Sequence, residues 1–171
     1  MAETRWLTEE QQRAWRRFAA VVMLLPAALE SQLQRDADLT HFGYWVLAML
    51  SEAPGQRLRM SELAAMSHGS QSRLSHLVSR LEARGWVRRE RVDQDGRGWL
   101  AVLTDAGYEK VVQTAPGHVE EVQSLVFDAL TPEQVRQLEE INTAILERLS
   151  PRAPKSRLRA ALDPGTPTEA S

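Results

Sequence analysis

The stretch that decides the fold is residues 60–107, MSELAAMSHGSQSRLSHLVSRLEARGWVRRERVDQDGRGWLAVLTDAG. In its middle part apolar residues recur at helical spacing, so that Leu74, Leu77 and Leu81 fall on one stripe of a helical wheel. Ser72 and His76 point the opposite way. The pattern predicts a helix that packs on one side and presents a small, polar and basic face on the other.

That polar face suits a DNA major groove, because short hydroxyls permit close approach and arginine or histidine can donate hydrogen bonds to phosphates and base edges. The alternative is an ordinary surface helix, which carries such a face more often than not. The surrounding charge favours DNA. From Gly69 to Trp99 there are seven arginines and four acidic residues, a local charge of +3 in a chain with a net charge of −2.

Two short strands are predicted after this helix, at residues 86–91 and Trp99–Leu103. The turn between them contains Asp95-Gly96, and Asp-Gly is a common hairpin signal that needs no function. Arg97 is more informative. An arginine at the tip of a hairpin beside a basic helix is placed to enter a neighbouring minor groove.

The composition indicates one packed domain with extensions, since the chain has 171 residues and 43% of them are apolar. No run approaches the roughly 18 apolar residues that span a bilayer. The first residues also lack the apolar core of a signal peptide, so a cytoplasmic protein without membrane contact is expected. Cysteine is absent, which excludes disulfides, thiolate zinc sites and thiol-based sensing in this chain.

A long helix is predicted near the N-terminus, where Thr8-Glu9-Glu10-Gln11 has the spacing of a capping box. Its apolar stripe extends from Trp15 to Leu33, and Pro26 is expected to kink the helix or to begin a second one. Such a helix either wraps around its own domain or pairs with a partner chain. Its length favours the partner.

The remaining elements are marked by caps and breaks. Thr40 is expected to cap a core helix that ends near residues 54–55, and residues 56–59 are expected to be extended. Thr104 is expected to cap a further helix with a bend at residues 116–117. A last helix begins near Thr131 and carries a narrow apolar seam. Apolar seams at both ends of the chain suggest that these ends meet in a dimer interface.

Residues 151–171 are rich in proline, alanine and small polar residues without periodicity, which predicts a disordered tail. Its four basic residues offer contacts to DNA phosphates as one interpretation. A solvated tail is the favoured interpretation.

The chain resembles a MarR-type winged helix-turn-helix transcriptional regulator over residues 8–150. The most specific match is Asp95-Gly96-Arg97 followed by Leu103-Thr104-Asp105-Ala106-Gly107, which is similar to the family's wing signature of Asp-x-Arg, a strand, and Leu-Thr-x-x-Gly. Supporting matches are Ser61-Glu62-Leu63-Ala64, Leu81-Glu82 with Gly85-Trp86-Val87, and Leu130-Thr131.

The resemblance implies a mainly α fold with a small β-hairpin wing. Its parts would be an N-terminal dimerisation helix segment (1–38), a winged helix-turn-helix DNA-binding domain (39–107), C-terminal dimerisation helices (108–150) and the disordered tail (151–171). It further implies a homodimer whose two recognition helices enter successive major grooves of a near-palindromic double-stranded DNA operator, with half-sites about 10 base pairs apart.

The DNA contacts are expected from the recognition helix and the wing, at Ser70, Gln71, Ser72, Arg73, Ser75, His76, Ser79, Arg80, Asp95 and Arg97. In the resemblance, Arg97 is the counterpart of the family's minor-groove arginine and Asp95 orients it. Gly96 departs from the family's common basic residue, which implies one phosphate contact fewer.

The family also implies a repressor controlled by a small aromatic or phenolic effector. The candidate ligand-binding residues are Trp15, Arg16, His41 and Trp45. Each of these aromatic residues is alternatively a core residue.

An enzyme is the competing class of function. The four histidines have no metal-ligand spacing, and no glycine-rich phosphate loop or Gly-x-Ser-x-Gly elbow occurs, so no catalytic residue, metal site or cofactor is expected. A second alternative is a winged-helix protein-interaction module without specific DNA binding. The seven arginines of the basic segment argue against that module.

Overall fold

The computed structural model describes residues 4–66, 71–92 and 98–149. It opens with one long helix, α1 (Glu9–Ala37), which begins at the predicted capping box. The Gln11 amide donates to the Thr8 hydroxyl at 3.2 Å, and the Thr8 amide donates to the Gln11 side chain at 3.0 Å. The helix continues through Pro26, so no second helix begins there, and it ends at Asp38, whose φ is 50°.

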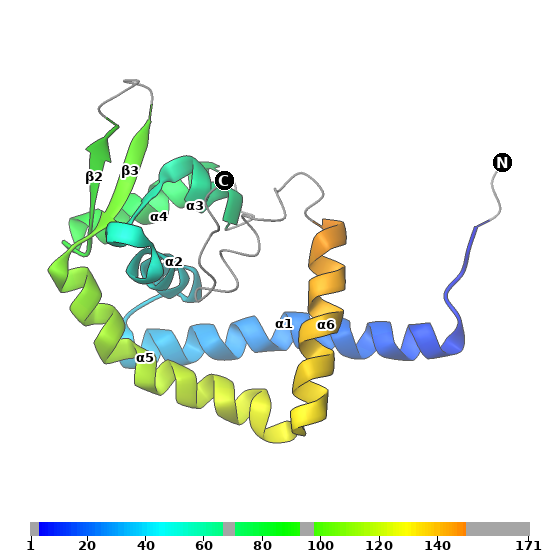
Figure 1. The fold of residues 1–171 in the computed structure, drawn as a ribbon. Helices are drawn as coiled ribbons and strands as arrows, with labels where there is room; N and C mark the ends of the chain where they lie inside the picture. Colours follow the sequence, from blue (N-terminus) through cyan, green and yellow to red (C-terminus); the bar gives the residue numbers. More distant parts are fainter. Residues whose placement is uncertain (1–3, 67–70, 93–97, 150–171) are drawn as a thin grey trace.

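A lobe of short helices and strands follows α1 (Figure 1). The Thr40 hydroxyl caps its first helix by accepting a hydrogen bond from the Gly43 amide at 2.9 Å. The elements of the lobe are α2 (His41–Glu52), the 3-10 turn η1 (Pro54–Gln56), β1 (Arg57–Arg59), α3 (Met60–Met66), α4 (Gln71–Ala83), β2 (Val87–Arg91) and β3 (Trp99–Leu103).

The sheet is antiparallel, with strand order β1-β3-β2. β2 and β3 form the predicted hairpin, with Val87 opposite Leu103 and Arg91 opposite Trp99. The other edge of β3 pairs with β1, where Arg57 lies opposite Val102. The extended segment predicted before α3 is therefore a strand of the same sheet, which leaves β2 at an open edge.

The hydrophobic core lies between the helices of the lobe and the sheet. The largest side chains with less than 2% exposure come from α1, α2, α3, α4 and β2, and they are Leu33, Val46, Leu47, Leu50, Leu63, Leu74, Val78 and Val87. The buried residues of α1 all lie between Leu29 and Ala37. The second half of α1 is therefore anchored in the lobe, and the first half is not.

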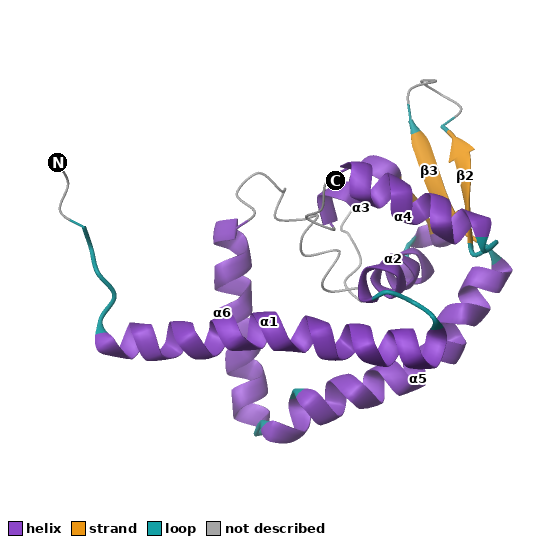
Figure 2. Cartoon of the chain, turned by 180° about the vertical axis from the view of Figure 1, so that it is seen from behind, coloured by secondary structure: helices purple, strands orange, loops and turns teal. Residues whose placement is uncertain are grey.

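Two long helices complete the chain, α5 (Asp105–Leu125) and, after the 3-10 turn η2 (Phe127–Ala129), α6 (Pro132–Leu149). Thr104 caps α5, and Thr131 forms a capping box with Gln134 at the start of α6. α5 continues through Pro116 and packs along the second half of α1. Figures 1 and 2 show the first half of α1 extending away from the lobe, with α6 running across the direction of α1.

A close backbone contact joins the wing to α5. The Thr104 amide donates to the Trp86 carbonyl at 3.1 Å, and the Thr104 hydroxyl donates to the Gly85 carbonyl at 2.6 Å. Gly107 lies against the Trp86 carbonyl, since a Cβ on Gly107 would be 2.0 Å from the Trp86 carbonyl oxygen. The Leu-Thr-x-x-Gly motif is thus a packing requirement of the joint between β3 and α5.

Candidate nucleic-acid interface

Helix α4 packs as its apolar stripe predicts. Leu74 and Val78 are fully buried, and Leu77 and Leu81 are 3% and 2% exposed. These four side chains fix the rotation of α4 about its own axis, since any other rotation would bring them into water. The opposite face is consequently held outward.

The structure places the predicted contact residues of α4 on this outward face. Exposed side chains are Ser72, Arg73, His76, Ser79 and Arg80, and Ser75 is half-buried. Ser70, Asp95, Arg97 and the side chain of Gln71 lie outside the described residues. The Arg73 guanidinium also lies over the Phe42 ring, 5.3 Å from its centroid, which restrains this arginine against α2.

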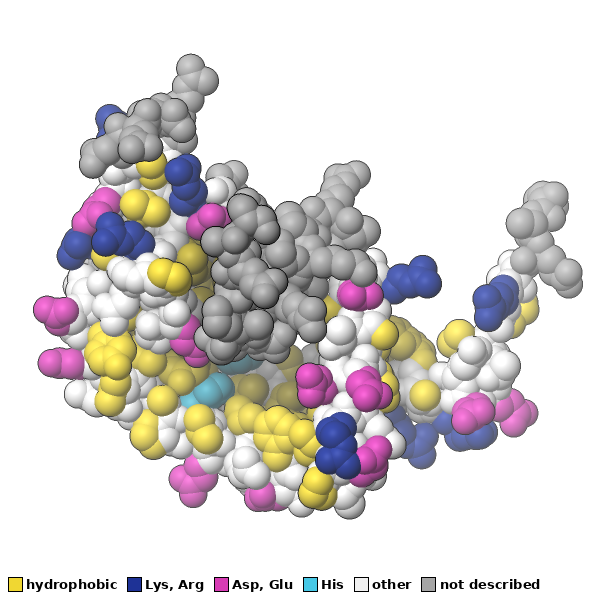
Figure 3. Space-filling view, viewed as in Figure 1, with side chains coloured by type: hydrophobic (Ala, Val, Ile, Leu, Met, Phe, Trp, Pro, Cys, Tyr) yellow, Lys and Arg dark blue, Asp and Glu magenta, His cyan; other side chains and the backbone are white. Residues whose placement is uncertain are grey.

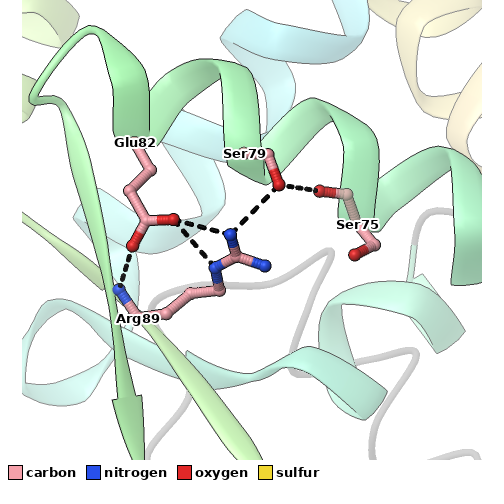
Figure 4. Close-up of polar contacts among 4 residues, drawn as sticks. All are labelled: Ser75, Ser79, Glu82 and Arg89. Carbon is pink, nitrogen blue, oxygen red and sulfur yellow. Dashed lines mark hydrogen bonds and ion pairs between the residues drawn. The ribbon is translucent and has the colours of Figure 1, made fainter.

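The Ser79 hydroxyl is already engaged within the protein (Figure 4). It donates to the Ser75 carbonyl oxygen at 3.0 Å and accepts from Nη2 of Arg89 at 3.1 Å. A hydroxyl has one hydrogen to donate. In this conformation Ser79 can therefore accept a hydrogen bond from DNA but cannot donate one, which narrows the role expected for it from the sequence.

Arg89 reaches this position from β2 because Glu82 of α4 holds it (Figure 4). Nε and Nη2 of Arg89 both contact Oε2 of Glu82, at 2.9 and 2.7 Å. The Arg89 side chain holds the pKa of the Glu82 carboxyl below its ordinary 4.5. Sequence reasoning counted Arg89 only as local positive charge and missed this contact between helix and strand.

Further arginines of the basic segment are paired with acids inside the protein. Arg84 contacts the Asp38 carboxylate at 2.7 Å, and Arg88 contacts Glu90 at 2.7 Å. On the face of the lobe in Figure 3, Lys and Arg side chains are accordingly interspersed with Asp and Glu. The +3 charge of the segment already includes Glu82 and Glu90 but not Asp38, so the pair of Arg84 with Asp38 lowers the positive charge that remains for a partner.

The hairpin of β2 and β3 projects from the lobe beside α4 (Figure 1). Near its outer end the Arg91 guanidinium lies over the Trp99 ring, 5.4 Å from the centroid. Trp99 is 47% exposed. This contact holds the end of β2 against the start of β3.

The four candidate ligand residues do not gather in one place. His41 is half-buried where α1, α2 and α5 meet, and Trp45 is half-buried on α2. Trp15 and Arg16 are exposed on the first half of α1. The His41 region contacts α1 near Gln32, which is 17 positions, or roughly 25 Å of helix, beyond Trp15. Within one chain these residues cannot line a common pocket.

The residues that do surround His41 were not singled out from the sequence. The His118 ring centroid lies 6.1 Å from that of His41 and 4.5 Å from that of Tyr44. Nδ1 of His118 lies 3.4 Å from Oε1 of Gln32, which is only 2% exposed. A glutamine within the apolar stripe of α1 was the available signal for this polar junction.

The junction predicts a loss of stability in mild acid. Burial lowers the pKa of His41 and His118 below their ordinary 6.5, with Glu30 opposing the shift at His41 and His41 adding to it at His118. Below about pH 6.5 the unfolded chain therefore binds more protons than the folded chain, and stability falls as the pH drops. We expect the melting temperature to fall by a few degrees between about pH 7 and pH 5.5.

Replacing His118 by Gln should reduce that pH dependence, because the variant lacks one of the two imidazoles whose pKa is lowered at the junction. Glu82 and Asp36 do not interfere, since their pKa values lie below 4.5 and 3.8 and their contributions are lost only in stronger acid. Melting curves followed by circular dichroism check this. An equal pH dependence of the melting temperature in His118→Gln and the unaltered chain would show that His118 does not cause the loss of stability in acid.

The described residues hold neither a candidate metal site nor a candidate membrane-spanning helix. Across residues 4–66, 71–92 and 98–149, no three His, Cys, Asp or Glu side chains are grouped so that they could hold a metal ion. In the same part of the chain, no helix is both long and apolar enough to cross a membrane.

Comparison with solved structures decides the family. Sco3205 from Streptomyces coelicolor, a MarR family transcriptional regulator solved in complex with DNA, is 50% identical in sequence and superposes with a TM-score of 0.84. The match covers 90% of this chain and 94% of that one. This chain belongs to the MarR family of transcriptional regulators.

Other comparisons agree with the MarR assignment. The MarR family profile matches residues 39–98. AbsC, a second MarR regulator of Streptomyces coelicolor, is 43% identical with a TM-score of 0.82, covering 87% of this chain and 100% of its own. The transcriptional repressor MprA of Escherichia coli is 28% identical over 62% of this chain, and the match spans only 60% of MprA. The winged helix predicted from the sequence is confirmed.

Proposed function

We propose that this MarR-family chain regulates transcription by binding a near-palindromic DNA operator as a homodimer. The observation that carries the proposal is the outward face of α4, where Ser72, His76 and Arg80 are exposed while the opposite stripe is locked in the core. Small polar and basic side chains on a rigid helix are what readout in the major groove requires. The complex of Sco3205 with DNA supports the same interpretation.

In this proposal the contacts divide by chemistry. Ser72, Ser75 and His76 read base edges, together with the start of the helix at Ser70 and Gln71, and Arg73 and Arg80 contact phosphates. Arg97, oriented by Asp95, enters the minor groove from the tip of the wing. Ser79 contributes at most an acceptor.

The homodimer is proposed from the apolar surface that a single chain leaves in water. Four consecutive residues of α1, Val21, Val22, Met23 and Leu24, are each at least 53% exposed. Consecutive positions face different directions around a helix, and a helix that is apolar all round is normally buried. On α6, Ile141 and Leu149 are 57% and 71% exposed. We assign the dimerisation role to residues 1–38 and 108–150, with the exposed first half of α1 and the exposed side of α6 as the contact surface.

We further propose that a small aromatic or phenolic effector relieves repression. His41 and Trp45 are the remaining candidates within one chain, and the half-buried junction of α1, α2 and α5 is where binding would alter the angle between lobe and dimerisation helices. A coupling of about 1–3 kcal/mol suffices for a 5- to 150-fold change in operator affinity. MprA, described as a repressor, supports the repressor role.

A protein-interaction module is the second candidate function. The internal pairing of Arg84, Arg88 and Arg89 favours it to a degree, because these charges are partly neutralised without DNA.

Selection of genomic fragments followed by mobility shifts at two salt concentrations distinguishes the two functions. A regulator should enrich a defined sequence and bind it less tightly at the higher salt, because phosphate contacts release counterions. Failure to enrich any sequence would favour the interaction module. Fragments bound without sequence preference would argue against base readout by α4.

A further inference from the structure

The carboxylate of Glu82 binds a backbone amide on the outer side of the edge strand β2. β2 is an edge strand, and the Arg89 amide on its outer side donates to Oε1 of Glu82 at 3.1 Å. The Arg89 side chain turns back to the other oxygen of the same carboxylate, with contacts at 2.9 and 2.7 Å. Three hydrogen bonds thus tie one residue of β2 to one residue of α4.

This tie lies between the two parts of the molecule that are proposed to touch DNA. Glu82 is the penultimate residue of α4, and Arg89 lies two residues before Arg91, where β2 ends and the turn of the wing follows. A DNA-binding protein that places a helix in the major groove and the tip of a hairpin in the minor groove needs this helix and this hairpin at a fixed spacing. The tie joins the C-terminal end of α4 to the strand that leads to the wing, where it can fix that spacing.

The same guanidinium also acts on the outward face of α4. Its Nη2 donates to the Ser79 hydroxyl at 3.1 Å, which directs the hydroxyl hydrogen to the Ser75 carbonyl. The Arg89 side chain is only 29% exposed, and its partner Glu82 is 36% exposed. This burial limits the access of the Arg89 guanidinium to a phosphate. The guanidinium of Arg89 is therefore engaged in contacts within the protein, whereas the side chain of Arg80 is exposed.

We propose that Arg89 is a positioning residue for operator specificity, which acts through Glu82 and Ser79 to hold α4 and the wing at the spacing of the operator. This inference rests on the proposed operator binding. It predicts that the planar shape of the Arg89 guanidinium matters rather than its charge, because lysine carries the same charge but has no planar group whose Nε and Nη2 both reach Oε2 of Glu82 while Nη2 also reaches Ser79.

Arg89→Lys tests this directly. We expect binding to the selected operator to weaken about tenfold, while affinity for unrelated DNA and the slope of affinity against salt stay as in the unaltered protein. The matched control is Arg88→Lys, on the neighbouring residue of the same strand, which is paired with Glu90 and should change neither quantity. A phosphate contact at Arg89 would instead be tolerant of lysine.

Glu82→Gln supplies a second variant that keeps the length of the side chain. Like Arg89→Lys, it should lower the ratio of operator affinity to affinity for unrelated DNA. The double variant should lower this ratio no further than the single variant with the larger effect, because both changes break the same tie. Circular dichroism confirms that each variant is folded at the assay temperature.

The outcomes separate the two proposals. If the unaltered protein enriches no sequence, operator binding and the positioning role are both overturned. If it enriches an operator but Arg89→Lys binds with unchanged specificity, or if the effects of Glu82→Gln and Arg89→Lys are additive, only the positioning role is overturned. An equal loss of affinity of Arg89→Lys for the operator and for unrelated DNA would also overturn it, because specificity would then be unchanged.

Discussion

Gly107→Ala is expected to destabilise the folded chain by at least about 3 kcal/mol, at the upper end of what overpacking costs. The new Cβ would lie 2.0 Å from the Trp86 carbonyl oxygen and 2.8 Å from Cδ1 of Leu103. The carbonyl cannot retreat easily, because it also accepts the Thr104 amide at 3.1 Å. Chemical denaturation followed by circular dichroism measures the loss.

Gly117→Ala is the matched control, since it lies in the same helix α5. A Cβ there would meet only Nε2 of Gln32, at 3.6 Å, an ordinary contact. Replacing glycine by alanine inside a helix should then stabilise the chain by up to about 1 kcal/mol. Similar stabilities for Gly107→Ala and the unaltered chain would mean that α5 leaves the wing in a different way.

Leu24→Glu should convert the proposed homodimer to monomers at micromolar concentration. Leu24 is 70% exposed in the single chain, and burying an unpaired carboxylate in the proposed interface would cost several kcal/mol. Operator affinity should fall at least about 100-fold, because a monomer reaches only one half-site. Sedimentation velocity measures the first effect and mobility shifts measure the second.

The control for Leu24→Glu is Gln34→Glu, which adds the same charge at an exposed, polar position of α1. It should remain dimeric. A Leu24→Glu protein that sediments as a dimer would remove the first half of α1 from the interface.

The fold was predictable where local chemistry decides it. Thr8, Thr40 and Thr104 each cap the helix that was expected to follow them, because a short hydroxyl side chain satisfies free amides at a helix start. Gly85 ends α4 with a φ of 73°, a conformation that favours glycine. The pairing of β1 with β3 was not predictable, because it depends on residues far apart in the sequence.

The candidate interface was predictable only in outline. The apolar stripe of α4 determines which face points outward. The partners of its arginines depend on tertiary structure, as in the contact of Arg84 with Asp38, 46 positions away. The same holds for His118 and Gln32, which lie 86 positions apart in sequence and meet at one junction. Periodicity therefore locates a face and leaves open which of its side chains are already engaged.

His76→Ala tests whether the outward face of α4 reads bases. Sequencing of DNA selected by this variant and by the unaltered protein gives the base preference at each operator position. We predict that discrimination falls by about 1 kcal/mol or more at one or two symmetry-related positions in each half-site and is retained elsewhere. An identical base preference in the two proteins would contradict base readout by the outward face of α4.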